Sequence, residues 1–146
     1  SLKKHRKKDS VEKEKLKVFL KDLIDKRVDE IYYLKPYQIK QLTKKTGVTF
    51  NVKEPSCFDR YNKFIRKDGI CMTLTEPHHN IMRIVEVRNN NNDRVRKMTP
   101  KEHFRFMGFS DDEIDLNGFT YNQLCKCAGN GWDVNLVSKI MKKIFN

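Results

Sequence analysis

A short segment near the end of the chain carries residue types that suit ligand binding. In Gly129-Asn130-Gly131-Trp132, two glycines flank one asparagine, and the last residue is the single tryptophan of the sequence. Glycine lets the backbone approach a ligand closely, and an indole offers a broad apolar face with one N–H donor. Such a segment can form one wall of a small-molecule pocket. Taken by itself, it favours the alternative of a helix-capping turn with Trp132 in the core.

Cysteines and histidines are the other residues whose chemistry has to be considered. Cys125 and Cys127 are too close to bridge comfortably and are poorly spaced for a zinc site. Cys57 and Cys71 belong to no Cys-x-x-Cys pair, so we expect four reduced thiols. The pair His78-His79 has no cysteine or carboxylate at ligand spacing, and we expect a surface loop and no metal site.

Basic side chains are unevenly distributed along the 146 residues. Lys and Arg number 31 against 19 Asp and Glu, which gives a formal net charge of +12. Residues 31–100 carry 14 basic and 6 acidic side chains, whereas residues 101–146 carry six of each. The first two-thirds should therefore meet a polyanion, and the last third should pack against protein or hold a small ligand. No stretch approaches the roughly 20 apolar residues that span a bilayer, so we expect no membrane partner.

The elements that position these residues follow from hydrophobic spacing and from turn residues. Apolar residues at three- and four-residue steps predict a helix from Val11 to about Lys26. Pro36 can open a second helix, which Gly47 ends. Alternation predicts strands over 48–52, 69–75 and 81–87, the last two joined by the turn 76–80, and residues 89–93 read as a loop.

Capping signals divide the last third into short helices. Thr99 and Glu102 form a predicted capping box with Pro100 at the first helical position, and that helix should end at Gly108. Ser110-Glu113 and Thr120-Gln123 repeat the same spacing, the latter for a helix that should stop at Gly129. Asp133 should cap a final helix. Helices and short strands together predict an α+β fold.

Two segments in this last third resemble conserved blocks of DNA cytosine-5 methyltransferases. Residues 96–102 (RKMTPKE) with 106–109 (FMGF) are similar to that family's ninth block, and residues 128–134 (AGNGWDV) are similar to its tenth and last block. Their order and spacing fit the family. Residues 69–75 (GICMTLT) resemble the T-L-T or T-L-S element of its target-recognition domain, which lies shortly before the ninth block, as here.

The resemblance implies that this chain is the C-terminal part of such an enzyme. The family's nucleophile is the cysteine of a Pro-Cys pair, which attacks a flipped cytosine. The four prolines here precede Tyr37, Ser56, His78 and Lys101, and neither F-x-G-x-G nor Glu-Asn-Val occurs. We therefore expect no catalytic residue in this chain and no methyl transfer by it alone. A large catalytic domain, in the same chain or a separate subunit, would be the protein partner.

The resemblance also implies roles for individual residues. Residues 1–95 would be the target-recognition region, which binds double-stranded DNA, and residues 96–146 would complete the methyltransferase fold. Asn130, Gly131 and Trp132 would line the pocket for S-adenosylmethionine. Support of the recognition domain would come from Arg96, Thr99 and Glu102, and the alternative for Arg96 is a solvated arginine in a basic run. Contacts to phosphates or bases would come from Thr73, Thr75, Arg60, Lys63, Arg66, Lys67, Arg83 and Arg88.

Two other functions are compatible with a basic chain. Residues 37–42 followed by Gly47-Val48-Thr49 resemble the first helix and turn of a helix-turn-helix, which would make a self-contained DNA-binding module without an enzymatic role. No good second helix follows, because Pro55 interrupts the pattern. An RNA-binding protein would need regularly spaced aromatic residues, which are absent. We expect a cytoplasmic protein of bacterial or phage origin, in the manner of a restriction–modification system.

Overall fold

The computed structural model describes residues 18–74, 82–87 and 94–145. Its helices are α1 (Leu20–Leu23), α2 (Pro36–Thr46), α3 (Pro100–Phe106), α4 (Tyr121–Asn130) and α5 (Val134–Phe145), with 3-10 turns η1 (Glu30–Tyr32) and η2 (Asp111–Glu113). Its strands are β1 (Ser56–Asp59), β2 (Phe64–Arg66), β3 (Arg83–Glu86) and β4 (Arg94–Arg96). No helix in these ranges is long and apolar enough to cross a membrane. The predicted α+β fold is confirmed.

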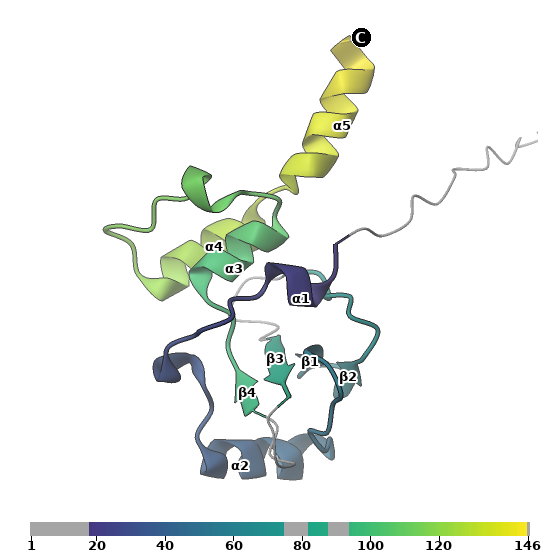
Figure 1. The fold of residues 1–146 in the computed structure, drawn as a ribbon, viewed down its shortest axis with the longest axis vertical. Helices are drawn as coiled ribbons and strands as arrows, with labels where there is room; N and C mark the ends of the chain where they lie inside the picture. Colours follow the sequence, from purple (N-terminus) through teal and green to yellow (C-terminus); the bar gives the residue numbers. More distant parts are fainter. Residues whose placement is uncertain (1–17, 75–81, 88–93, 146) are drawn as a thin grey trace, which may run out of the picture.

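The four strands form an antiparallel sheet in the order β2-β1-β3-β4. Helix α2 covers one side of the sheet, α1 and α3 lie on the other side with α4 behind α3, and α5 projects away from the rest (Figure 1). The outer edge of β4 is partly paired, because Leu34 donates its backbone N–H to Val95 O at 2.8 Å and Lys97 donates to Tyr32 O at 2.9 Å. The chain after η1 therefore shields an edge that would otherwise be open.

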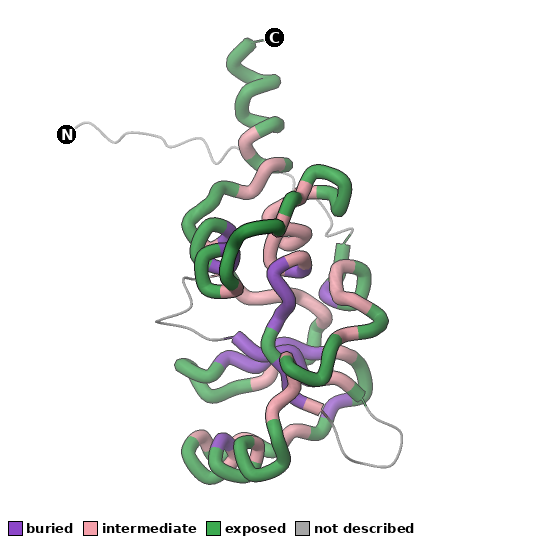
Figure 2. The backbone as a smooth tube through the Cα atoms, turned by 90° about the vertical axis from the view of Figure 1, so that its left-hand side faces the viewer, coloured by how far each residue is buried: buried purple, intermediate pink, exposed green. Residues whose placement is uncertain are grey.

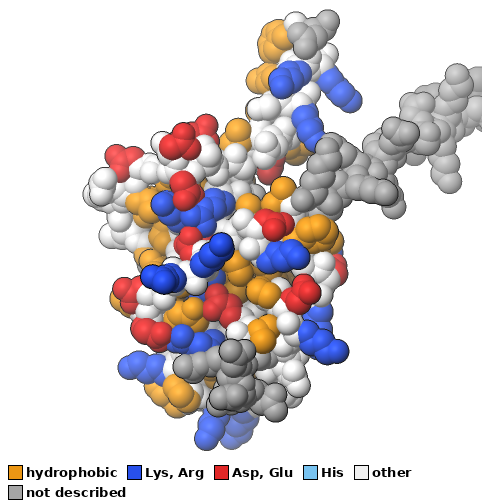
Figure 3. Space-filling model, in the orientation of Figure 1, with side chains coloured by type: hydrophobic (Ala, Val, Ile, Leu, Met, Phe, Trp, Pro, Cys, Tyr) orange, Lys and Arg blue, Asp and Glu red, His pale blue; other side chains and the backbone are white. Residues whose placement is uncertain are grey.

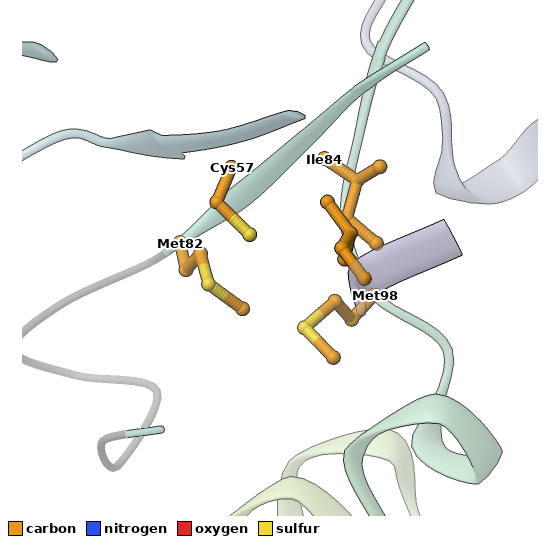
Figure 4. Close-up of a cluster of buried hydrophobic side chains, with 5 residues drawn as sticks. Cys57, Met82, Ile84 and Met98 are labelled. Atoms are coloured by element: carbon orange, nitrogen blue, oxygen red, sulfur yellow. The ribbon is translucent and has the colours of Figure 1, made fainter. Parts of the chain in front are cut away.

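Each face of the sheet carries its own hydrophobic cluster. The strand period of two sends Cys57 and Ile84 to one face, where Leu20, Met82 and Met98 join them (Figure 4). On the α2 side, the buried members are Leu42, Val52, Phe58, Val85 and Val95. Buried residues concentrate in the sheet and at the helices that cover it, while α5 is exposed for most of its length (Figure 2).

Two of the predicted strands are absent. Residues 48–52 and 69–74 form no ladder, although their apolar side chains pack against the two clusters. Alternation indicates that one face of a segment is buried, but it does not show that the segment pairs with a strand. Here both edges of β1 are already paired, one with β2 and the other with β3. Gly69, with φ of +72°, also breaks an extended run. The third predicted strand is confirmed as β3, but β1 and β4 are its partners and no hairpin joins it to residues 69–74.

The N-terminal helix is much shorter than predicted in its described part. Helix α1 ends at Leu23, and Ile24 is extended with ψ of 148°, while residues 11–17 lie outside the described residues. Helix α2 is confirmed, with Pro36 in its first turn and a left-handed Gly47 as its C-cap. Residues 47–55 then lead into β1, so no second helix follows and the helix-turn-helix alternative has no structural support.

Capping in the last third follows the sequence closely. Glu102, Glu113 and Gln123 each reach back to the cap backbone N–H at 2.8 Å. Asp133 Oδ1 accepts from Leu136 N at 2.7 Å and opens α5. One boundary differs from the prediction: α4 passes through Gly129 and ends at Asn130, with Gly131 as its C-cap.

A buried ion pair joins β4 to α3. Arg96 is fully buried and donates two parallel hydrogen bonds of 2.8 Å to Glu102, which is also fully buried, and a further bond to Glu86. Glu102 accepts from Asp25 N at 2.8 Å as well, which fastens the chain after α1 to the same point. Burial opposes the charge on Arg96, but the hydrogen bonds and charges of Glu102 and Glu86 together outweigh burial and keep the pKa of Arg96 above its ordinary value.

Replacing Glu102 by Gln tests the charge of this pair, because Gln123 shows that glutamine completes the same capping box in this chain. Glu102→Gln leaves the buried guanidinium with weaker compensation, and we expect the free energy of unfolding to fall by about 2–4 kcal/mol in urea denaturation.

The matched control is Glu113→Gln, which changes an exposed capping box that has no arginine partner. We expect it to leave the denaturation midpoint almost unchanged. Equal midpoint shifts in the two variants would mean that the Arg96–Glu102 charge pair has no special weight in this fold.

His103 should make stability depend on pH. Burial lowers the pKa of its imidazole from the ordinary 6.5 to about 4, against an opposing effect of Glu102. Between these values the unfolded chain binds a proton that the folded chain does not, so stability falls as the pH drops from 6.5 to 4, by up to about 3 kcal/mol. Asp111, whose pKa Arg105 lowers to about 2, contributes only below this range.

The measurement is the urea midpoint at several pH values for the wild type and for His103→Gln. We expect the variant to lose most of the pH dependence between 6.5 and 4. A variant as pH-sensitive as the wild type would assign the effect to other groups.

Candidate functional site

A basic pocket of about 370 Å³ opens between η1, α2 and one end of the sheet. Its charged lining residues are Lys45, Arg60, Arg83 and Lys97, and no acidic residue lines it. They come from α2, the end of β1, the start of β3 and the residue after β4, so the antiparallel pairing brings them together. The volume lies at the small end of the range for ligand pockets, about 300–1,000 Å³.

Arg83 is the most deeply placed of the four. It is paired with Phe58 in the β1–β3 register, on the face that α2 covers, and only 7 % of it is exposed. Its Nη1 donates to Met82 O at 3.2 Å, and no carboxylate among the described residues pairs with it. Burial, with a smaller effect from Arg60, lowers the pKa of Arg83 to about 10. A buried cation without a paired carboxylate is stabilised by any anion that reaches it.

The structure unites only some of the basic residues predicted to contact DNA. Arg60 and Arg83 share the pocket, but Arg66 pairs with Asp68 at 2.9 Å, and Lys67 lies beside Glu54 and Phe19 in a separate depression. Lys63 is exposed in the turn after β1, with φ of 58°. Thr73 is exposed and belongs to no strand, and Thr75 and Arg88 lie outside the described residues. On the face in Figure 3, basic and acidic side chains are intermingled.

Two of the four basic residues that line the pocket were not predicted from the sequence. Lys45 lies three residues after the buried Leu42, so both face the same side of α2. Lys97 directly follows the buried Arg96, so its side chain takes the opposite direction, and its Nζ lies 5.8 Å from the Tyr121 ring centroid. Helical spacing alone could have identified Lys45, but Lys97 required the pairing of β4.

The predicted cofactor residues lie where α4 passes into α5. Asn130 is the exposed last residue of α4, Gly131 is its C-cap, and the indole of Trp132 is 75 % exposed. A Cβ at Gly131 would approach Cys127 O to 3.2 Å and Ala128 O to 3.3 Å, so its glycine is explained by packing against α4. The exposed indole and amide can provide one wall of a ligand site, and the remaining walls must come from elsewhere.

The predicted structural residues all lie in the network between β4 and α3. Arg96 has no exposed surface, so the alternative of a solvated arginine is wrong. Thr99 Oγ1 accepts from Glu102 N at 3.2 Å and donates to Asp25 at 3.1 Å. None of the three side chains lines the basic pocket.

Helix α5 presents an apolar face that the described residues leave uncovered. Its exposed members are Leu136, Ile140, Met141, Ile144 and Phe145, and no residue of α5 is buried. Figure 3 shows hydrophobic side chains gathered at the projecting end of this helix. A strongly amphipathic helix in this state is suited to packing against another polypeptide surface.

Comparisons with known proteins relate the chain to methyltransferases. It is 34 % identical over 85 residues to the type II methyltransferase M.BanI of Aneurinibacillus aneurinilyticus, an alignment that covers 57 % of this chain and 18 % of that protein. The solved structure of the Entamoeba histolytica methyltransferase EhMeth has a similar fold, with a TM-score of 0.50 and 24 % identity over 90 % of this chain and 41 % of that one. The chain thus spans less than half the length of either protein.

The family comparison covers the complete sequence. The model of the family described as C-5 cytosine-specific DNA methylase matches residues 1–146. The resemblance of residues 96–109 and 128–134 to methyltransferase blocks agrees with this match. The chain therefore belongs to the C-5 cytosine-specific DNA methylase family.

Proposed function

We propose that this chain is the C-terminal, target-recognising part of a DNA cytosine-5 methyltransferase. The observation that carries the proposal is a family match over residues 1–146 in a sequence that contains no Pro-Cys pair. Methylation at C5 of a flipped cytosine needs a cysteine nucleophile, which a large domain outside this chain would supply. The similarity to the type II methyltransferase M.BanI supports a role in methyl transfer.

Within the assembled enzyme, the chain's basic residues bind the duplex. Lys and Arg neutralise backbone phosphates and fix the protein's register on DNA, which provides affinity before any base is read. The Arg96–Glu102 pair holds the sheet against the C-terminal helices, so recognition residues and the Trp132 turn keep a fixed relation. Arg96 is thus a positioning residue.

The Trp132 turn would form one wall of the cofactor site. S-adenosylmethionine would supply the methyl group there, and the exposed indole of Trp132 would pack against it while Asn130 offers an amide for hydrogen bonding. The large domain would provide the other walls. Helix α5 would pack its apolar face on that domain, which explains why this face is exposed in the chain alone.

The first test is transfer of labelled methyl groups from S-adenosylmethionine to duplex DNA. We expect no turnover by this chain alone, because it has no nucleophile, and turnover after addition of the Pro-Cys-bearing large domain as a separate chain. In the mixture, Trp132→Ala should raise KM for S-adenosylmethionine by about tenfold, because the substitution removes one apolar contact surface.

The control is Phe119→Ala, which removes another exposed aromatic residue outside the turn and should leave that KM unchanged. Turnover by the isolated chain would disprove the proposal that the catalytic nucleophile lies in a separate large domain. Equal effects of the two substitutions would remove Trp132 from the cofactor site.

The role of α5 is tested by measuring association of the two chains by analytical ultracentrifugation. Ile144→Asp places a carboxylate on the apolar face and should weaken association by at least about tenfold, since burying an unpaired charge is costly. Lys142→Asp changes the charge by more, but on the polar face, and should leave association nearly intact. The docking role of α5 fails if Lys142→Asp is the more disruptive change.

A further inference from the structure

We propose that the basic pocket beneath η1 and α2 binds one backbone phosphate of duplex DNA, with Arg83 as its innermost ligand and Lys45, Arg60 and Lys97 around it. The choice of DNA as the polymer rests on the proposed function, whereas the anion site rests on the pocket alone.

Arg83 has unused hydrogen-bonding capacity inside the protein. A guanidinium carries five N–H donors, and the described contacts engage only Nη1, with a backbone carbonyl at 3.2 Å. The residue is more than nine-tenths buried and lines the pocket. Phosphate oxygens match a guanidinium in geometry and charge, so a phosphate would satisfy donors that the described contacts do not engage.

The other arginines of the sheet and of α3 are used differently. Arg66, Arg94, Arg96 and Arg105 each pair with at least one carboxylate. Arg83 has no such partner among the described residues, although it is more buried than Arg66. Among the arginines that the structure describes in the sheet and in α3, this pocket therefore holds the one that pairs with no described carboxylate.

The basic side chains at the rim of the pocket are likewise not paired with the nearby carboxylate of Asp59. Asp59 is next to Arg60 in the chain, but its carboxylate accepts from Tyr61 N, Asn62 N and Asn62 Nδ2 at 2.7–2.9 Å and so stabilises the turn after β1. Lys97 lies over the Tyr121 ring and Lys45 is exposed in the last turn of α2. The amides of Gln38 and Gln41 add neutral donors at the wall.

The size of the pocket favours a single phosphate group with its adjoining atoms. At about 370 Å³ it cannot receive a duplex groove, but a phosphate on the duplex surface can enter from the open side. Contacts of this kind fix the register of a protein on DNA without reading its sequence. The pocket would therefore set orientation, and other residues would read the bases.

The test compares duplex binding by the full 146-residue chain in two lysine variants. Lys44 and Lys45 are neighbours in α2 and both exposed, but only Lys45 lines the pocket. Affinity is measured by fluorescence anisotropy over a range of salt concentrations. We expect Lys45→Ala to weaken binding about fivefold and to reduce the salt slope by about one, and Lys44→Ala to change both much less.

Arg83→Met serves as a second variant, and it removes an uncompensated buried charge while keeping an unbranched side chain. We expect at least the loss seen with Lys45→Ala, with thermal unfolding confirming that the fold persists. Inorganic phosphate titrated into the wild type should shift the NMR signals of the Arg83 Nε–H and the Lys45 amide saturably, while chloride at equal ionic strength should not.

Three outcomes would overturn the proposal. Equal losses in Lys44→Ala and Lys45→Ala would show only general attraction to a basic surface. A saturable phosphate shift without any pocket-specific loss of duplex affinity would assign the site to a free phosphate or nucleotide. A loss confined to a matched RNA hairpin would replace DNA by RNA.

These measurements need no methyl transfer. Pocket-specific duplex binding with no turnover in the reconstituted enzyme would reject the proposed function and uphold the phosphate site. Turnover with unaltered binding in the pocket variants would do the reverse.

Discussion

The fold depends on one fully buried ion pair between a strand and a helix. Arg96 and Glu102 lie only six residues apart, yet their bonds reach β3 through Glu86 and the chain after α1 through Asp25 N. Two desolvated charges are costly unless nearly all their hydrogen-bonding atoms are used, and here Lys97 O accepts a further bond from Arg96 while Thr99 N donates one to Glu102. The geometry that satisfies them fixes the sheet against α3.

Arginine thus has two distinct uses in this small protein. In the network its charge is matched by carboxylates and contributes rigidity, whereas in the pocket Arg83 is buried on the same sheet with no carboxylate partner among the described residues. The network and the pocket lie on opposite faces of the sheet, since neighbouring residues of a strand point to opposite faces. A basic composition alone does not separate these uses, because both raise the net charge equally.

Local signals in the sequence were sufficient for the helices of the last third. The boxes at Thr99, Ser110 and Thr120 act within four residues, so they predicted helix starts that the structure confirms. Strand pairing depends on residues distant in the chain, which is why β1, β2 and β4 were missed and residues 69–74 were assigned a strand. The pocket joins four separate segments, and therefore only part of it, Arg60 and Arg83, was predicted.

Helix α5 has a consequence for the thermodynamics of assembly. It has 12 residues, and helices of this length are marginal in water without tertiary packing. A polypeptide that covers its apolar face would therefore also shift its helix–coil equilibrium, and part of the intrinsic affinity would be consumed in ordering the backbone. The observed heat capacity change would then combine apolar burial with helix formation, and it would exceed the value calculated from rigid docking of the same surface.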